Sequence, residues 1–191
     1  SLVDNNFDPN YLIAGIPKKL DKSWNISEDK IFVIEADEYD TCFFDKRPKF
    51  FHYYPAILLV NNIEFDHADI YENIEMIEDN FFELIKTMPS NSKVLVNEHR
   101  VSERFKNNLV THKLETTLQF LSIDASNIHE ENKLLAAYAV EEFLPKDKVL
   151  SSLEDYKGVK RRFETIFEND NFKLIDDFAH HPTAIDETIK M

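Results

Sequence analysis

The sequence has very little glycine and cysteine. Among its 191 residues it holds two glycines, Gly15 and Gly158, and one cysteine, Cys42. A phosphate-cradling loop of the G-x-x-x-x-G-K-[ST] type needs glycines so that backbone amides can approach the phosphate oxygens, and the sequence contains no such loop. A single cysteine excludes an internal disulfide and suits a reducing compartment. We expect Cys42 to be a small buried apolar side chain, because no pattern of a catalytic base accompanies it.

Long apolar runs and excess positive charge are also missing. No stretch reaches the length that crosses a membrane, and no basic-then-apolar leader is present. The net charge of −14 argues against binding to the phosphate backbone of nucleic acids, although a nucleotide pocket needs only local donors. The content of 43% hydrophobic and 30% charged residues is typical of globular proteins. We therefore expect a cytoplasmic protein with no nucleic-acid or membrane partner, whose oligomeric state stays open.

Short apolar runs indicate strands that are buried on both faces. Residues 31–34 (IFVI) and 56–60 (AILLV) are apolar without alternation, as in parallel sheets. Helical spacing of apolar residues over 72–88 predicts a helix that leads to a strand at 93–97. The expected fold class is therefore α/β, a mostly parallel sheet with flanking helices. Further helices are expected at 98–108, 127–144, 151–156 and 183–190, a strand at 118–123, and a hairpin at 163–167 and 172–175.

Acids, amides and a histidine follow the first two predicted strands. Glu35 comes directly after the first run, and Asn62 and His67 follow the second. Ligands of open α/β sheets bind beyond the carboxyl ends of the strands, so these side chains stand where such a sheet carries its site. Oxygen-rich groups suit Mg²⁺ bound together with phosphate. A structural interpretation, in which the residues are helix caps and solvated loop, stays open for either strand end alone.

Several motifs in the sequence resemble those of a known enzyme family. EADEYD (35–40), FFDKR (43–47), NNIEFDHADIY (61–71), GVKRRFE (158–164) and DDFAHHPTA (176–184) together resemble the Mur ligases, ATP-dependent amide-forming enzymes of bacterial cell-wall synthesis. The resemblance implies a partial central ATP-binding domain over residues 1–158 and the beginning of a C-terminal α/β ligase domain over residues 159–191. It also implies that the chain is a fragment, because the phosphate-binding loop of the family is absent.

The resemblance implies roles for individual residues. Glu35 and His67 match the Mg²⁺ ligands and are expected to be catalytic, and His180 matches a residue near the incoming amine. The positions that match nucleotide-binding residues are Asn62, Asn132, Arg162 and Asp177, the last on the ribose hydroxyls. Asn132 lies in IHEEN (128–132), an imperfect match, so a first-turn polar residue is an equal interpretation. Arg161 and Arg162 are also compatible with a surface basic pair.

The implied activity is ligation in peptidoglycan recycling. ATP phosphorylates the lactyl carboxyl of UDP-N-acetylmuramate, and the amine of the murein tripeptide L-alanyl-γ-D-glutamyl-meso-diaminopimelate then displaces phosphate. The aromatic and basic segment 43–54 favours the tripeptide over free L-alanine, the substrate of the alternative ligase. Two further alternatives are a catalytically incomplete binding fragment and a dinuclear metallohydrolase, which needs several converging His and Asp ligands.

Overall fold

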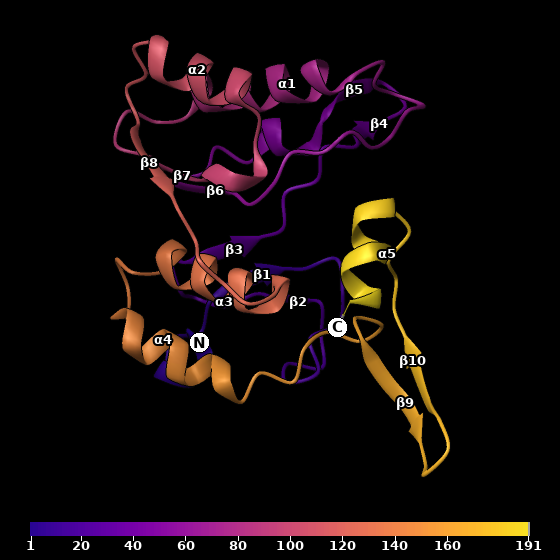
Figure 1. The fold of residues 1–191 in the computed structure, drawn as a ribbon. Coiled ribbons are helices and arrows are strands. Elements are labelled where there is room, and N and C mark those ends of the chain that lie inside the picture. Colours follow the sequence, from indigo (N-terminus) through magenta and orange to yellow (C-terminus); the bar gives the residue numbers. More distant parts are fainter. Residues whose placement is uncertain (191) are drawn as a thin grey trace. The chain divides into compact units, whose positions relative to one another are not determined.

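The computed structural model describes residues 1–190 and has the expected α/β architecture (Figure 1). Met191, the last residue of the predicted second domain, lies outside the described residues. The chain forms two compact units, the first made of residues 1–35 and 144–190 and the second of residues 36–143. The predicted domain boundary between residues 158 and 159 stays a prediction. No helix among residues 1–190 is long and apolar enough to cross a membrane.

The second unit is built on a three-stranded parallel sheet. Its order is β6 (Ile57–Val60), β7 (Lys93–Asn97) and β8 (Thr117–Leu121). Helix α1 (Ile74–Thr87) connects β6 to β7, and α2 (Glu103–Thr111) connects β7 to β8. Helix α3 (Ile128–Ala139) follows β8 and contacts β6 and β7. The sheet therefore consists of crossover units, as the strand–helix–strand pattern predicts.

Both faces of this sheet are covered, which explains why its strands are apolar without alternation. Val94 and Val96 point into the larger core, which α1 and α2 close with Ile77, Leu84 and Phe105. The opposite face forms a smaller core from β7, β8 and α3, made of Leu95, Leu121 and Leu135. All eight of these core side chains are at most 3% exposed.

The N-termini of the helices are set by side-chain caps. Asn73 accepts from the backbone N–H of Met76 at the start of α1. Ser102 accepts from the N–H of Phe105 and begins α2, so the predicted helix at 98–108 is wrong in its first half. That half is instead the 3-10 helix η3 (Glu98–Arg100), followed by extended residues. A serine in extended conformation stops one segment and starts the next.

Two other helix boundaries differ from the prediction. Helix α3 ends at Ala139 rather than at residue 144, because the β-branched Val140 leaves helical geometry, and Phe143 is 41% exposed. Helix α4 (Lys146–Glu154) occupies the predicted loop at 145–147 and ends before the predicted end of the 151–156 helix. Pro145 stands at its N-cap, where the fixed φ of proline is compatible with a helix start.

A small antiparallel hairpin precedes β6 and was not predicted. Strand β4 (Asp40–Cys42) pairs with β5 (Asp45–Pro48), and the 3-10 helix η2 (Lys49–His52) follows. Phe50 from η2 is 1% exposed and belongs to the larger core. Cys42 is exposed, so the expectation of a buried thiol is wrong. A two-stranded hairpin has no second sheet to cover it, so alternate side chains stay in solvent.

The first unit has a mixed sheet of order β2-β1-β3, with β1 (Asn10–Leu12) antiparallel to β2 (Trp24–Asn25) and parallel to β3 (Phe32–Ile34). Strand β3 is the predicted run at 31–34. It lies in a different sheet from β6, and Phe32 is 58% exposed, so the expectation of burial on both faces is wrong for this strand. The strand is at the edge of its sheet, where it pairs with β1 on one side only.

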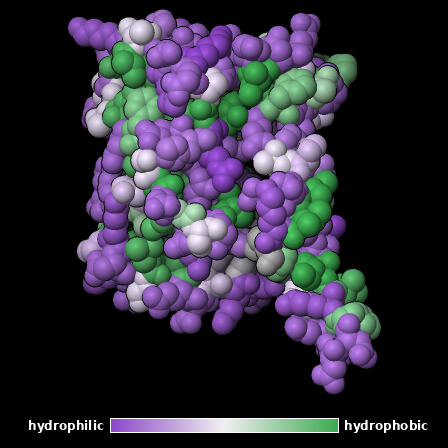
Figure 2. Space-filling model, viewed as in Figure 1, coloured by the Kyte–Doolittle hydropathy of each residue, from purple (hydrophilic) through white to green (hydrophobic). Residues whose placement is uncertain are grey.

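The remaining elements of the first unit are η1 (Val3–Asn5), α4, the hairpin of β9 (Glu164–Glu168) and β10 (Lys173–Asp176), and α5 (Pro182–Ile189). The predicted hairpin and final helix are thus confirmed. Asn169 closes the hairpin turn by accepting from the N–H groups of Asn171 and Phe172. Figure 2 shows hydrophilic and hydrophobic residues together on the hairpin surface, where Phe172 is 58% exposed.

Candidate functional site

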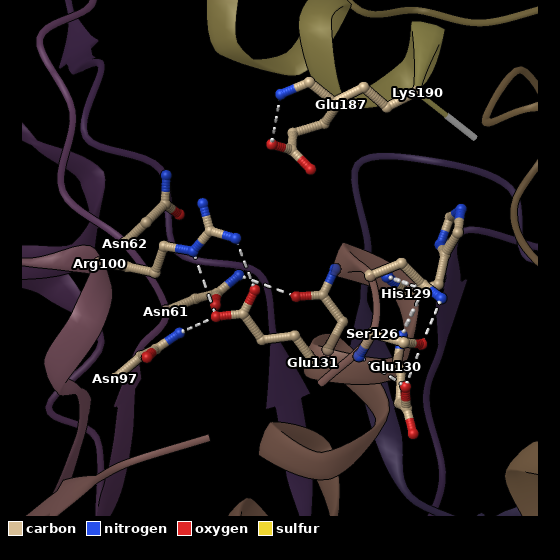
Figure 3. Close-up of polar contacts among 12 residues, drawn as sticks. Asn61, Asn62, Asn97, Arg100, Ser126, His129, Glu130, Glu131, Glu187 and Lys190 are labelled. Carbon is tan, nitrogen blue, oxygen red and sulfur yellow. Dashed lines mark hydrogen bonds and ion pairs between the residues drawn. The ribbon is translucent and has the colours of Figure 1, made fainter. Parts of the chain in front are cut away.

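A buried polar cluster lies at the carboxyl ends of β6 and β7. Asn97 ends β7, and its Nδ2 donates to Glu131 Oε1 of α3 at 2.7 Å. Arg100 donates to the same carboxylate through Nε at 3.2 Å and Nη2 at 2.8 Å. Figure 3 shows Asn97 and Arg100 pointing toward Glu131. The sheet end and the first turn of α3 are therefore tied by charge-assisted bonds.

The ionised form of Glu131 is stabilised within this cluster. Burial alone would raise the pKa of Glu131, but the hydrogen bonds and positive charge of Arg100 and the amide of Asn97 outweigh it and lower that pKa. An ionised carboxylate only accepts hydrogen bonds, so Asn97 must turn its NH₂ toward Glu131. Its Oδ1 is then left without a donor, which the geometry also shows.

A second amide lies beside Asn97 on the neighbouring strand. Asn61 follows Val60, which is paired with Val96, so Asn61 and Asn97 occupy adjacent strand ends. The Nδ2 of Asn61 donates to Asn132 Oδ1 at 3.1 Å. Among residues 1–190, Asn61 Oδ1 is also a buried acceptor without a hydrogen-bond partner. Buried acceptors without partners are uncommon, and one explanation is a bound group that donates to them.

The residues predicted from the sequence are partly in this cluster. Asn132 is in it through its contact with Asn61, and its nucleotide-binding role stays a prediction. Asn62 is not linked to Asn132; the link is made by its neighbour Asn61. The Nδ2 of Asn62 lies 3.5 Å from Glu64 Oε1.

His67 lies in a second polar cluster of the same unit. Its Nε2 is 3.0 Å from Glu38 Oε1, and the Tyr39 ring packs edge-on against the imidazole with centroids 4.7 Å apart. The Tyr39 hydroxyl donates to Asp69 at 2.7 Å and lowers the pKa of that carboxyl. The backbone of His67 has φ 56°, in the left-handed region, and its N–H donates to Asp66.

The EADEYD segment is fixed by two contacts on its other side. Lys49 Nζ lies 2.8 Å from Asp37 Oδ2, and the buried Tyr71 donates its hydroxyl to the carbonyl of Glu38 at 2.6 Å. Burial alone would raise the pKa of Asp37, but the Lys49 hydrogen bond and the N–H of Tyr39 outweigh it and lower that pKa. The carboxylate of Asp37 therefore stays ionised and held in place.

Glu35 belongs to the first unit, and His67 to the second. Glu35 Oε2 accepts from the backbone N–H of Ala14 at 2.9 Å, so it closes the turn after β1. The carboxylate that contacts His67 is Glu38, three residues further along the chain. A Mg²⁺ shared by Glu35 and His67 stays a prediction.

The predicted site residues of the C-terminal part lie in and near the segment of residues 161–163. Asp177 uses both oxygens on backbone amides, accepting from Phe163 at 2.6 Å and Ala179 at 2.7 Å. The guanidinium of Arg162 lies 5.8 Å from the centre of the Phe178 ring. His180 packs edge-on against the same ring. Asp177, Arg162 and His180 thus lie close together in the first unit. The Asp177 carboxylate holds the backbone at Phe163 to its own segment after β10.

The described residues contain no preformed cluster of metal-binding side chains. Within residues 1–190, no three His, Cys, Asp or Glu side chains converge on a point that could hold a metal ion. The dinuclear metallohydrolase alternative needs such convergence and is not supported. Mg²⁺ is ordinarily bound by one or two protein groups together with phosphate oxygens and water, so His67 with a carboxylate fits a site of that kind.

Sequence reasoning missed several residues that make contacts in these clusters: Glu38, Asn61, Asn97, Arg100 and Glu131. Glu38 stands inside EADEYD, and Asn97 ends a correctly predicted strand, so both positions offered the same signal as Glu35 and Asn62. Arg100 and Glu131 are separated by thirty-one positions and gave no local signal. Only the packing of α3 on β6 and β7 brings them together.

The comparisons with known proteins point in one direction. Residues 13–143 match the family model of the Mur ligase middle domain. The UDP-N-acetylmuramate–L-alanyl-γ-D-glutamyl-meso-2,6-diaminoheptandioate ligase of Escherichia coli strain K12 is 32% identical over 213 residues, which cover 96% of this chain and 46% of that protein. The UDP-N-acetylmuramate–L-alanine ligase of Chlorobium phaeobacteroides is 27% identical over 222 residues, covering 99% and 46%.

A solved structure supports the same likeness. The crystal structure of the UDP-N-acetylmuramate:L-alanyl-γ-D-glutamyl-meso-diaminopimelate ligase from Neisseria meningitides matches with a TM-score of 0.72 and 28% identity, covering 84% of this chain and 61% of that one. The chain spans about half the length of the curated relatives it matches.

Proposed function

Because the chain belongs to the Mur ligase family, we propose that the whole protein is an ATP-dependent ligase of peptidoglycan recycling. Its substrates would be UDP-N-acetylmuramate and the murein tripeptide L-alanyl-γ-D-glutamyl-meso-diaminopimelate. The observation that carries the proposal is the 32% identity to the Escherichia coli tripeptide ligase across 96% of this chain. The exposed Cys42 thiol is compatible with work in the reducing cytoplasm.

The proposed reaction has two steps. A carboxylate oxygen of the lactyl group attacks the γ-phosphorus of ATP, and ADP leaves. The amine of the tripeptide then attacks the acyl carbon, loses a proton, and expels inorganic phosphate as the amide forms. Transfer of a phosphoryl group depends on positioning and on neutralising charge more than on covalent help from the protein.

The polar cluster of Asn61, Asn97 and Asn132 supports a nucleotide site. Two buried carboxamide oxygens at adjacent strand ends lack donors, and the exocyclic amino group of adenine supplies N–H donors. The carboxyl ends of parallel strands are the usual place for such a ligand. We extend the role to Asn62, Arg162 and Asp177 as further nucleotide contacts and to His180 as a residue near the amine.

Glu35 and His67 are proposed as groups that hold Mg²⁺, and the fit rests on the donor set around His67. An imidazole with one carboxylate in contact, together with phosphate oxygens, is compatible with a divalent cation. When bound, Mg²⁺ neutralises charge on the transferring phosphoryl oxygens. His67 must be neutral to bind a cation, so its proton has to be on one ring nitrogen only.

The test uses the full-length protein with ATP, Mg²⁺ and UDP-N-acetylmuramate. We expect the tripeptide to be joined, with product seen by mass spectrometry and one phosphate released for each amide. His67→Ala should reduce turnover while the thermal unfolding curve stays unchanged, because a loop residue contributes little to the core. The proposal is refuted if the full-length protein forms no amide with the tripeptide or with free L-alanine.

The second candidate is the ligase that uses free L-alanine. The 27% identity to the Chlorobium phaeobacteroides enzyme over 99% of this chain favours it as the alternative. The same assay separates the two, because the ratio of kcat/KM for tripeptide and for L-alanine identifies the preferred amine. A ratio in favour of L-alanine would replace the first candidate by the second.

A further inference from the structure

Glu38 is the carboxylate that contacts His67, and none of the roles above uses it. Its Oε1 lies 3.0 Å from His67 Nε2. A carboxylate accepts hydrogen bonds, so this contact is a hydrogen bond when the imidazole carries its proton on Nε2. The lone pair of a neutral His67 is then on Nδ1. No hydrogen bond between residues 1–190 reaches that nitrogen.

The surroundings hold both partners in this arrangement. The backbone of Glu38 is fixed by the hydroxyl of the buried Tyr71, which donates to its carbonyl at 2.6 Å. The imidazole is fixed by the Tyr39 ring, whose plane stands at 87° to it. Tyr39 is in turn held by Asp69, which accepts from its hydroxyl at 2.7 Å. Tyr39 and Tyr71 thus orient the pair formed by Glu38 and His67.

His67 also has a strained backbone. Its φ of 56° lies in the left-handed region, which a non-glycine residue occupies at an energetic cost. Such residues persist where neighbouring contacts fix them, and they are concentrated at functional sites. The amide of His67 donates to Asp66 Oδ1 at 2.7 Å, which contributes to that fixation.

We propose that Glu38 is the positioning residue of His67. By accepting from Nε2–H it selects one tautomer and one ring orientation, and it leaves Nδ1 as the nitrogen available to a divalent cation. Metal-binding histidines generally donate their other ring N–H to such a partner, whose loss costs about 10- to 100-fold in metal affinity or activity. The assignment depends on the proposed function in one respect, because that function identifies the ligand of Nδ1 as a divalent cation.

The first test reads the hydrogen bond without nucleotide, metal or turnover. The full chain is labelled with ¹⁵N-histidine and studied by NMR at mildly alkaline pH, where histidine is neutral. His67 is assigned by comparison with His67→Gln. We expect a slowly exchanging Nε2–H signal that Glu38→Gln keeps, because the amide oxygen still accepts, and that Glu38→Ala loses. Glu72→Ala, which removes an exposed glutamate close by in sequence, should leave it unchanged.

A proton found on Nδ1 of wild-type His67 would overturn the proposal. So would an Nε2–H signal that survives unchanged in Glu38→Ala.

The second test measures the binding of Mn²⁺, as a substitute for Mg²⁺, to the full-length protein with a non-hydrolysable ATP analogue. Glu38→Ala should weaken Mn²⁺ by about 10- to 100-fold, with a smaller loss in Glu38→Gln. An unchanged affinity in Glu38→Ala would refute the positioning role. A wild-type protein that shows the NMR signal and binds Mn²⁺ but forms no amide would refute the proposed ligase and leave the assignment of Glu38 intact.

Discussion

At the scale of single residues, the most consequential contact is the one between Arg100 and Glu131. The carboxylate is 6% exposed, and the two hydrogen bonds from Arg100 are 2.8 and 3.2 Å long. Truncating one partner of a buried charged pair leaves the other without its compensation. We therefore predict that Arg100→Ala lowers the free energy of unfolding by about 1–3 kcal/mol, measured by urea denaturation.

Arg47→Ala is the matched control for that measurement. Arg47 also bonds a carboxylate through two nitrogens, at 2.9 and 2.7 Å from Asp45, but its side chain is 64% exposed. Exposed pairs contribute about 0–1 kcal/mol, because water screens them. Equal losses in the two variants would show that burial does not decide the strength of the Arg100 pair.

Glu131 also predicts a pH dependence with a definite sign. Its pKa is lowered in the folded state from the ordinary 4.5, so folding stabilises the ionised form. This contribution to stability is complete above pH 4.5 and is lost as the pH falls through the folded-state pKa. Subtracting the unfolding free energy of Glu131→Gln from that of wild type at each pH isolates the effect. The difference should shrink as the pH falls below 4.5 and not above it.

At the scale of elements, α3 connects the fold to the candidate nucleotide site. Asn127 caps this helix by accepting from the N–H groups of His129 and Glu130, both at 3.0 Å. The first turns of α3 carry Glu131 and Asn132. Loss of the cap should therefore loosen the residues that face Asn61 and Asn97.

We predict that Asn127→Ala lowers the free energy of unfolding by about 0.5–2 kcal/mol. Asn127→Asp should restore it, because a carboxylate caps equally well and is favoured at a helix N-terminus. Hydrogen exchange of the α3 amides should rise in the alanine variant and not in the aspartate variant. If both variants exchange as wild type does, α3 is held by its packing alone.

The elements also show which patterns in the sequence were reliable. Helix α1 and strands β6 and β7 were predicted because their apolar residues are spaced to fill a core on fixed faces. The break before α2 was missed because Ser102 caps the helix with its side chain, a signal that apolar spacing does not carry. Strand β3 was misjudged because an apolar run looks the same whether or not helices later cover it.

At the scale of the whole molecule, the sequence motifs were enough to identify the family. The contacts within the site could be identified only from the folded structure. EADEYD and NNIEFDHADIY are continuous in sequence, so the resemblance could be read directly. The bonds between Asn61 and Asn132 and between Glu38 and His67 join positions 71 and 29 residues apart. Which asparagine and which glutamate make such contacts depends on strand register and loop geometry. The sequence therefore placed the site near Asn62 and Glu35, whereas the contacts use Asn61 and Glu38.

The last prediction concerns the catalytic capacity of residues 1–191. They contain two glycines and no phosphate-cradling loop, and the chain covers 46% of its Escherichia coli relative. A phosphoryl transfer needs the γ-phosphate fixed by backbone amides and cations at the same time as the acceptor is in place. We predict that this chain alone releases no ADP in response to UDP-N-acetylmuramate and tripeptide, whereas the full-length protein does. Coupled-enzyme measurement of ADP compares the two at equal concentration, with Glu38→Ala full-length protein as an impaired reference. Substrate-dependent ADP release by residues 1–191 at the full-length rate would show that the phosphates are held without a glycine-rich loop.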